Sequence, residues 1–205
     1  MVHNTSSKKG VTMIELIAYV ALYGVIMSLL ATLVFVIMQT TRRVNRQSIL
    51  NRGTKMLYTE FLAQSINFNP DYVEINEPTT DTVSVTLEKR YRYDNEGNRI
   101  KIVAGDSEYA NKPVKLTYSY KKGEDKMYYT YTKLDAEGTT TTNVIDLDFG
   151  MTITSTSAND EDISNIFTII NKSNMSKSLV FNGNLNYDKK SIEFNFIIPI
   201  YVVNE

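Results

Sequence analysis

The stretch that decides the fold is VTMIELIAYVALYGVIMSLLATLVFVIM, residues 11–38. Its only ionised side chain is Glu15, and residues 16–38 carry no charge at all. A helix of about 20 apolar residues is long enough to cross the hydrocarbon core of a bilayer. A helix that is apolar on every side is buried in lipid or against other helices, whereas a surface helix has one apolar stripe. We therefore expect residues 11–38 to form a single membrane-spanning helix.

A short polar leader, residues 1–10, precedes this helix. It ends in Lys8, Lys9 and Gly10, and the apolar residues begin directly at Val11. A secretory signal has its small-residue cleavage site after the apolar region, which is then removed. No Ala-x-Ala pattern follows Met38. We therefore expect any cleavage to precede the helix, so that the helix stays in the mature chain.

Residues 8–17, KKGVTMIELI, resemble the N-terminal signature of type IV pilins and of the pseudopilins of type II secretion and competence systems. The resemblance implies that a prepilin peptidase recognises Lys8 and Lys9, cleaves between Gly10 and Val11, and methylates the new amine. It also implies a pilin-like fold without a cofactor. The expected partners are other pilin or pseudopilin subunits, an inner-membrane assembly platform with its ATPase, and membrane lipid before assembly.

Glu15 is the residue that the resemblance assigns to assembly. A carboxylate at the edge of the hydrocarbon costs a few kcal/mol on insertion scales and normally has a partner or a function. After cleavage, the ammonium group of Val11 would pair with Glu15 of a neighbouring subunit and set the axial register, while apolar packing supplies most of the cohesion. The alternative is that Glu15 lies in the headgroup zone without a specific role.

The apolar run departs from the family pattern in two places and agrees with it in a third. Val11 replaces the usual phenylalanine, and Thr32 stands where many major pilins carry a proline that kinks the helix. Gly24 falls where the family often has a glycine that loosens the helix, although such a glycine also serves as a helix-packing contact. Tyr19, the missing proline and the absence of cysteine make the chain more similar to a minor pilin or minor pseudopilin than to a shaft protein.

Residues 39–68 continue the helix with an amphipathic pattern. Leu50, Leu57 and Phe61 share one face, and Tyr58, Leu62 and Ile66 form an adjoining row. We expect a soft break at Gly53, because glycine weakens a helix interior, and an end at the Asn69-Pro70 pair.

Residues 69–205 form the predicted extracytoplasmic β-rich domain, in which the alternating pattern of strands begins after residue 81. We expect residues 69–81 to be a turn-rich connector, residues 139–142 to be a polar loop, and Pro199 to end the last strand or lie at a sheet edge. The predicted strands are 83–93, 100–102, 114–120, 127–133, 144–149, 163–170, 179–187 and 192–203. The fold class is therefore α+β, a long helix packed against an antiparallel sheet.

Composition excludes several classes of chemistry. The 205 residues include no cysteine and one histidine, His3 in the leader, so neither a histidine-based triad nor a common zinc site can form. We expect no catalytic residue and no metal ligand. Asp148-Phe149-Gly150 matches the kinase metal-binding tripeptide without its companion motifs, and we interpret it as a chance match in a strand. Residues 160–162 are acidic but lack EF-hand spacing, which favours a solvated loop.

Tyrosines at 118, 120, 128, 129 and 131 offer two interpretations. They could stack on sugars or on single-stranded nucleic acid. Cross-strand packing in a small sheet is the interpretation that we favour. With a net charge of -1, the chain gives no sign of a polyanionic partner, and we expect nucleic acid only indirectly, in DNA uptake.

Arg42, Arg43, Arg46 and Arg52 follow the apolar run and bear on its orientation. The positive-inside rule alone would place the C-terminal side in the cytoplasm. The leader signature implies the opposite orientation, with the β-domain outside the bacterial cytoplasmic membrane, and we follow the signature. If the rule holds instead, the filament hypothesis fails. In a filament the arginines would meet acidic faces of neighbouring subunits.

The leading hypothesis is a non-enzymatic structural subunit of a type IV pilus-like filament or of a type II secretion or competence pseudopilus. The sequence does not decide between these systems. The alternative is a signal-anchored monomeric protein whose β-domain binds a ligand at the cell surface. No constellation of side chains supports a third possibility, a membrane-tethered enzyme.

Overall fold

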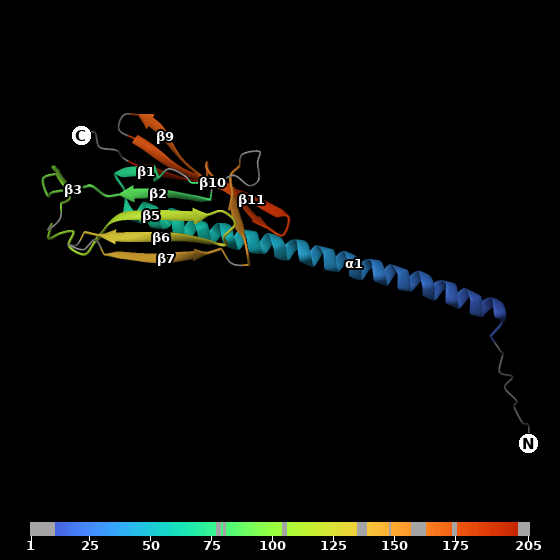
Figure 1. Cartoon of the computed structure of the whole chain (residues 1–205). Coiled ribbons are helices and arrows are strands. Elements are labelled where there is room, and N and C mark those ends of the chain that lie inside the picture. The colour runs from blue at the N-terminus through green and yellow to red at the C-terminus, as the bar shows by residue number, and fades with distance from the viewer. Residues whose placement is uncertain are drawn as a thin grey trace, which may run out of the picture. The chain divides into compact units, whose positions relative to one another are not determined.

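The computed structural model describes residues 11–76, 79, 81–103, 106–134, 139–147, 149–156, 163–173 and 176–200 (Figure 1). The chain divides into two compact units, Met1–Asn45 and Arg46–Glu205. A long helix begins in the first unit, and all the strands belong to the second. The predicted α+β class is therefore confirmed. The predicted boundaries at residues 10, 38 and 68 stay predictions.

The helical part consists of three consecutive segments without an intervening loop, α1 (Met13–Leu57), a π-helix η1 (Tyr58–Ala63) and α2 (Gln64–Phe68). The predicted break at Gly53 is wrong, because α1 continues through it. A Cβ atom at Gly53 would lie 2.7 Å from both Leu185 Cδ2 and Met151 Sδ, so the glycine permits close approach to strands rather than a break. The predicted end is confirmed, because Asn69 caps α2 with a left-handed backbone, φ 49°.

The π-helix has a specific partner in the facing sheet. A π-helix replaces the i→i+4 hydrogen bonds of an α-helix with i→i+5 bonds, so its carbonyl groups lose their regular α-helical partners. The Tyr118 hydroxyl lies 3.3 Å from the Glu60 carbonyl oxygen and 3.2 Å from that of Phe61, and it donates to them. The Ser65 hydroxyl donates to the Tyr118 oxygen at 3.2 Å. One buried tyrosine thus satisfies the irregular turn.

A five-stranded antiparallel sheet has the order β1-β2-β5-β6-β7 (Figure 1). Its strands are β1 (Tyr72–Asn76), β2 (Thr82–Glu88), β5 (Pro113–Lys121), β6 (Lys126–Lys133) and β7 (Thr140–Asp146). The β5–β6 hairpin is confirmed. The prediction of a connector at 69–81 is wrong for residues 72–76, because they form β1. This strand pairs in register with β2 from Tyr72↔Glu88 to Asn76↔Ser84. The polar loop predicted at 139–142 is wrong from Thr140 onward, because these threonines pair with β6.

The second sheet is organised around β10 (Ser176–Tyr187), which pairs with β11 (Lys190–Ile200) on one side and with β8 (Thr152–Thr154) and β9 (Phe167–Ser173) on the other. The β10–β11 hairpin is confirmed, with Phe194, Phe196 and Ile198 buried. Pro199 lies on β11, which is an edge strand of this sheet, as predicted. Strand β8 was not predicted. A separate two-stranded sheet, β3 (Tyr91–Tyr93) with β4 (Arg99–Lys101), confirms the hairpin around residues 94–98.

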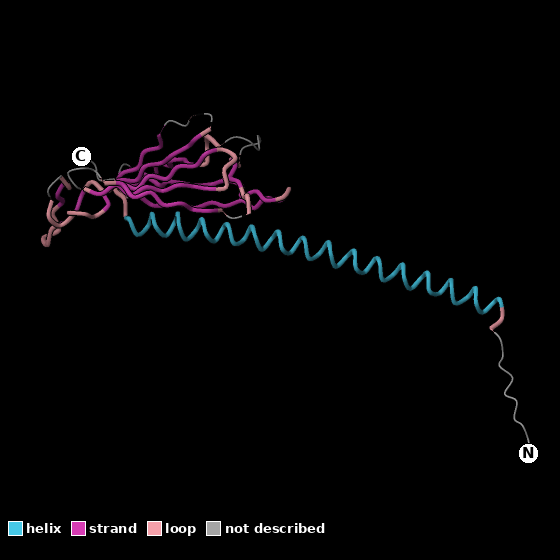
Figure 2. The backbone as a smooth tube through the Cα atoms, turned by 60° about the horizontal axis from the view of Figure 1, so that its bottom comes forward, coloured by secondary structure: helices cyan, strands magenta, loops and turns pink. Residues whose placement is uncertain are grey.

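The core of the second unit forms where the helix meets both sheets. Leu50, Leu57 and Phe61 are fully buried, as their spacing predicts. The Phe61 ring centroid lies 4.6 Å from that of Tyr118 on β5 and 4.5 Å from that of Phe181 on β10. Figure 2 shows the strands gathered along this part of the helix. The adjoining row is only partly packed, since Tyr58 and Ile66 are 54% and 52% exposed.

Candidate functional site

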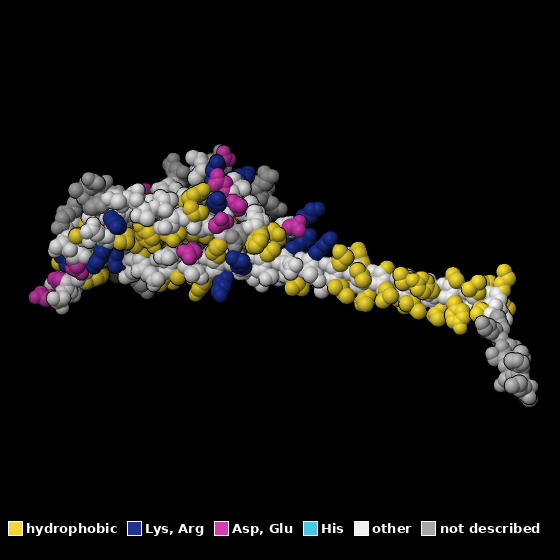
Figure 3. Space-filling model, turned by 90° about the horizontal axis from the view of Figure 1, so that it is seen from below, with side chains coloured by type: hydrophobic (Ala, Val, Ile, Leu, Met, Phe, Trp, Pro, Cys, Tyr) yellow, Lys and Arg dark blue, Asp and Glu magenta, His cyan; other side chains and the backbone are white. Residues whose placement is uncertain are grey.

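The first unit presents an apolar helix surface that no other described residue covers. Every residue from 11 to 45 is exposed. Figure 3 shows hydrophobic side chains along this stretch. Among the described residues, one helix is long and apolar enough to cross a membrane by length and composition. An uncovered apolar helix of this length is a candidate for contact with lipid or with other helices.

Glu15 lies in the first turn of α1 and forms a reciprocal cap with Thr12. The Thr12 N–H donates to Glu15 Oε2 at 2.8 Å, and the Thr12 hydroxyl donates to the same oxygen at 2.9 Å. In return, the Glu15 N–H lies 3.3 Å from Thr12 Oγ1 and donates to it. This capping box satisfies two of the N–H groups that a helix start leaves open. Within the described residues, Glu15 Oε1 makes no hydrogen bond and can accept one from a further donor.

The remaining predicted site residues fall into two groups. Lys8, Lys9 and Gly10 lie outside the described residues. Val11 is described, is 67% exposed and precedes the first helical residue. Gly24 lies inside α1, where an added Cβ would meet nothing within 4 Å in the described part of the chain. The structure therefore brings Val11 and Glu15 to the same end of the helix and leaves Gly24 without a contact of its own.

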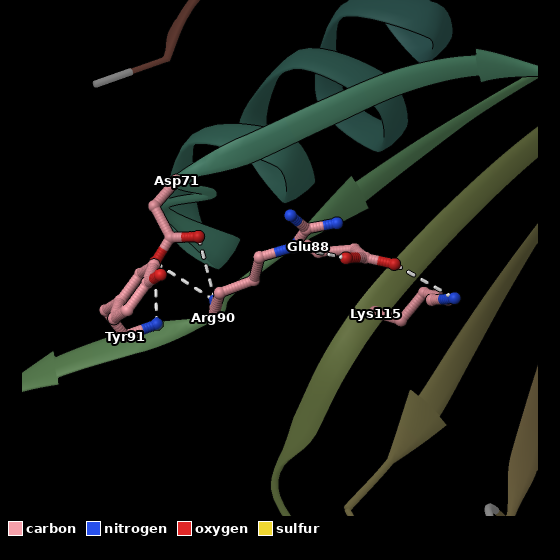
Figure 4. Close-up of polar contacts among 5 residues, drawn as sticks. All are labelled: Asp71, Glu88, Arg90, Tyr91 and Lys115. Carbon is pink, nitrogen blue, oxygen red and sulfur yellow. Dashed lines mark hydrogen bonds and ion pairs between the residues drawn. The ribbon is translucent and has the colours of Figure 1, made fainter. Parts of the chain in front are cut away.

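A second candidate site lies in the β-domain, where β1, β2 and β3 meet (Figure 4). Asp71 accepts hydrogen bonds from the backbone N–H groups of Arg90 at 2.8 Å and Tyr91 at 2.8 Å. Glu88 forms ion pairs with Arg90 Nε at 2.7 Å and Lys115 Nζ at 2.9 Å. The Arg90 guanidinium carbon lies 3.2 Å from the Tyr72 ring centroid. These contacts fix the start of β3 against the five-stranded sheet.

Burial raises the pKa of both carboxylates, whereas their hydrogen-bond donors and the neighbouring positive charges lower it. Burial raises the pKa of Asp71 above its ordinary value, and this effect exceeds the lowering by the N–H groups of Arg90 and Tyr91. Burial also raises the pKa of Glu88, but the hydrogen bonds and charges of Lys115 and Arg90 outweigh it, so the net shift is downward. Both carboxylates already have partners, so neither is organised as a free acid or base.

Next to Asp71 lies a hollow of about 310 Å³, in the size range of small-ligand sites. Its aromatic walls are Tyr91, Tyr93 and Tyr109. The other lining residues are Asn69, Pro70, Asp71, Lys89, Arg92 and Glu108. Arg92 pairs with Asp106 at 2.9 Å and with Glu108 at 3.1 Å, which joins β3 to the 106–109 segment. The hollow thus combines one exposed ring, that of Tyr93, and two half-buried rings with balanced charges.

The tyrosines at 118, 120, 128, 129 and 131 do not line this hollow. Tyr118 and Tyr120 are fully buried, and Tyr118 lies opposite Tyr129 across the β5–β6 pair. The Tyr118 and Tyr129 ring centroids lie 5.8 Å apart, and the Tyr131 ring meets Tyr129 on the same strand edge to face at 5.7 Å. The predicted cross-strand packing is confirmed for Tyr118 and Tyr129.

The other sequence signals carry no site in the described residues. Asp148 and residues 160–162 lie outside them. Phe149 and Gly150 were predicted in a strand but lie in a turn with φ values of 54° and 72° after β7 ends at Asp146, so that prediction is wrong. No cluster of metal-binding side chains occurs in the part of the chain that the structure describes.

Comparisons with protein-family models, curated proteins and solved structures gave no match. Function must therefore be argued from the chain itself. Sequence reasoning missed Thr12, although the pattern Thr12-x-x-Glu15 was the signal of a capping box. It also missed the pair of Asp71 and Arg90, which lie 19 positions apart and meet only through sheet pairing.

Proposed function

We propose that this chain is a structural subunit of a type IV pilin-like filament, held in the bacterial cytoplasmic membrane by residues 11–38 before assembly. A prepilin peptidase would remove residues 1–10, and an inner-membrane platform with its ATPase would transfer the subunit into the filament. The β-domain would face outward. The departures at Thr32 and Tyr19 support a minor subunit, and no catalytic step is part of the proposal.

The observation that carries this proposal is the exposed apolar helix with a single acid in its first turn. Burying a large apolar side chain contributes about 1.5–3 kcal/mol, so a stretch of this length is unstable in water without a cover. Lipid covers it in the membrane, and copies of the same helix cover it in a filament. Because both environments are apolar, moving from one to the other has no large hydrophobic barrier, and packing and polar pairs decide the outcome.

Glu15 supplies the polar pair. Its Oε2 atom holds the Thr12 amide and hydroxyl, while its Oε1 atom has no hydrogen bond within the described residues. After cleavage, the ammonium group of Val11 in a neighbouring subunit would be a cation suited to Oε1. In a low-dielectric helix bundle, breaking such a pair costs several kcal/mol, so it would select one axial register.

Processing is tested by co-expression with a prepilin peptidase and intact-mass measurement. We expect loss of residues 1–10 and one added methyl group. Gly10→Val should abolish the cleavage without changing membrane association. An uncut chain in the presence of an active peptidase, verified on a known prepilin, would overturn the processing step.

Assembly is tested by replacing Glu15 with alanine. We expect the variant to insert in the membrane and to disappear from sheared surface fractions. Glu74→Ala, at an exposed position on β1, removes the same charge from the β-domain and should assemble normally. Normal surface levels of the Glu15→Ala variant would show that the charge pair is not used.

The hollow beside Asp71 favours one alternative, a signal-anchored protein that binds a ligand at the cell surface. Its three tyrosine rings and paired charges suit a small neutral polar ligand. This alternative predicts an uncut N-terminus and a monomer in detergent. Loss of residues 1–10 together with incorporation into filaments would exclude it as the main function.

A further inference from the structure

The helix segment directly after the apolar run has an unusual charge composition. Residues 39–59 contain four arginines and one lysine, and no aspartate or glutamate occurs between Glu15 and Glu60. The basic residues are Arg42, Arg43, Arg46, Arg52 and Lys55. The helix therefore cannot neutralise these charges with acids of its own at i+3 or i+4.

Within the second unit, the later arginines have partners. Arg46 Nη2 forms an ion pair with Asp188 in the β10–β11 turn. Arg52 also takes part in an interaction. The arginine pair, Arg42 and Arg43, differs from them. Both side chains are exposed, and neither lies within ion-pair distance of a carboxylate in the part of the chain that the structure describes.

The position of the arginine pair matches the dimensions of a bilayer. The 23 uncharged residues 16–38 span about 34 Å as a helix, against a hydrocarbon thickness of about 30 Å. Arg42 follows Met38 by four positions, about 6 Å further along the helix. The headgroup layer on each side is about 5–8 Å thick. With the apolar run in the hydrocarbon, the arginine pair therefore lies at the level of the lipid phosphates.

We propose that Arg42 and Arg43 bind the phosphate groups of anionic phospholipids while the subunit is in the membrane. The inference depends on the membrane-spanning state in the proposed function, but not on cleavage or assembly. A guanidinium group forms paired hydrogen bonds with phosphate oxygens, which suits arginine better than lysine for this role. A second copy is a poorer partner at this level, because laterally packed helices at the same depth would bring arginine against arginine.

The absence of tryptophan from the chain makes a direct test possible. Gln39→Trp places a single reporter at the end of the apolar run, where tryptophan is well accommodated at a membrane interface. The full chain carrying this change is reconstituted in phosphatidylcholine vesicles. Quenching by brominated phosphatidylglycerol is then compared with quenching by brominated phosphatidylcholine, which gives the relative affinity of the two lipids for the helix.

We expect phosphatidylglycerol to be favoured roughly fivefold for one bound arginine and up to about 25-fold for both, since each basic residue near an anionic surface contributes a factor of this size. Arg42→Gln with Arg43→Gln should reduce the ratio to near unity. A charge-matched control, Lys101→Gln with Lys126→Gln, alters two exposed residues of the β-domain and should leave the ratio unchanged. Salt at about 1 M should weaken the preference.

Four outcomes would contradict the proposal in different ways. Equal quenching by the two lipids, or a preference that survives loss of both arginines, would overturn the lipid site while leaving the membrane anchor intact. Loss of filament incorporation in the double arginine variant with an unchanged lipid ratio would assign the pair to a neighbouring subunit. No quenching by either lipid would show that the helix is not in the bilayer, and both the site and the proposed anchor would fail.

Discussion

The backbone N–H of Ile153 on β8 donates a hydrogen bond to the Tyr120 hydroxyl on β5 at 2.8 Å. The two residues belong to different sheets. The same hydroxyl donates to the Glu124 carbonyl oxygen at 2.9 Å, in the turn between β5 and β6. One phenol group therefore joins the two sheets and closes a turn, and the bond that closes the turn requires that the phenol keep its proton.

We expect the folded chain to lose stability at alkaline pH because of this arrangement. Burial raises the pKa of Tyr120 to about 12, whereas in the unfolded chain it lies near 10. The folded state thus holds its proton more tightly, so the contribution is complete below pH about 10 and is lost as the pH rises toward about 12. The full loss is about 2–3 kcal/mol. Thermal unfolding of the full chain in detergent, followed between these pH values by near-UV circular dichroism, measures it.

Tyr120→Phe is the matched variant. It should be less stable at neutral pH by about 1–3 kcal/mol, because the Ile153 N–H loses its partner. It should also lose less stability between pH about 10 and 12 than the unmodified chain. An unchanged alkaline loss would show that another group is responsible.

Tyr118→Phe should destabilise the β-domain by about 1–3 kcal/mol. The change leaves the Ser65 hydroxyl and the carbonyl oxygens of the π-helix without the Tyr118 hydroxyl as a partner. Tyr128→Phe, on the adjacent strand β6 with its side chain only partly buried, is the control and should change stability by less than about 0.5 kcal/mol. Equal melting temperatures for the two variants would contradict the role of Tyr118.

Gly53→Ala should destabilise the chain although alanine favours helices. The helix-propensity gain is about 1 kcal/mol. The added methyl group would lie 2.7 Å from the side-chain ends of Leu185 and Met151, which are fully buried and have little room to shift, and overpacking of this kind costs about 1–3 kcal/mol. Gly24→Ala meets no atom within 4 Å and should raise helix stability. Adding Met151→Ala to Gly53→Ala should recover part of the loss. Stabilisation by Gly53→Ala alone would show that the close approach does not limit packing.

Lys189→Gly should stabilise the β10–β11 hairpin. Asp188 and Lys189 have φ values of 42° and 64°, the pattern of a two-residue turn in which both central residues adopt positive φ. A left-handed lysine costs about 1–2 kcal/mol that glycine avoids, so an increase of a few degrees in melting temperature is expected. Lys190→Gly, one position later in β11, should lower it. The same direction of change for both would contradict the turn assignment.

The helices were largely predictable because their signals are local. The spacing of Leu50, Leu57 and Phe61 identified the buried face, and the Asn69-Pro70 pair marked the end. The role of Gly53 was not predictable, because a glycine that breaks a helix and a glycine that allows close packing look alike in sequence. The π-helix was equally hidden, because its partner Tyr118 lies 57 positions after Phe61.

The strands were less predictable where pairing overrides composition. Residues 72–76 follow a proline and resemble a connector, yet β2 provides them with a complete register. The threonines from 140 to 142 are polar because they lie in an edge strand with exposed side chains, and sequence patterns do not separate such a strand from a loop. The cluster of Asp71, Glu88, Arg90 and Lys115 depends on the same pairing, so no local motif indicated it.

The unbroken run of α1 from Met13 to Leu57 has a mechanical consequence. A pull applied near Glu15 is carried along the helix backbone as far as Leu57. That tension arrives at Leu50 and Leu57, the centre of the packed core, and not at a surface loop. A pulling force on the N-terminal part of α1 therefore acts directly on the core of the β-domain. The mechanical stability of that core sets the force at which the domain unfolds.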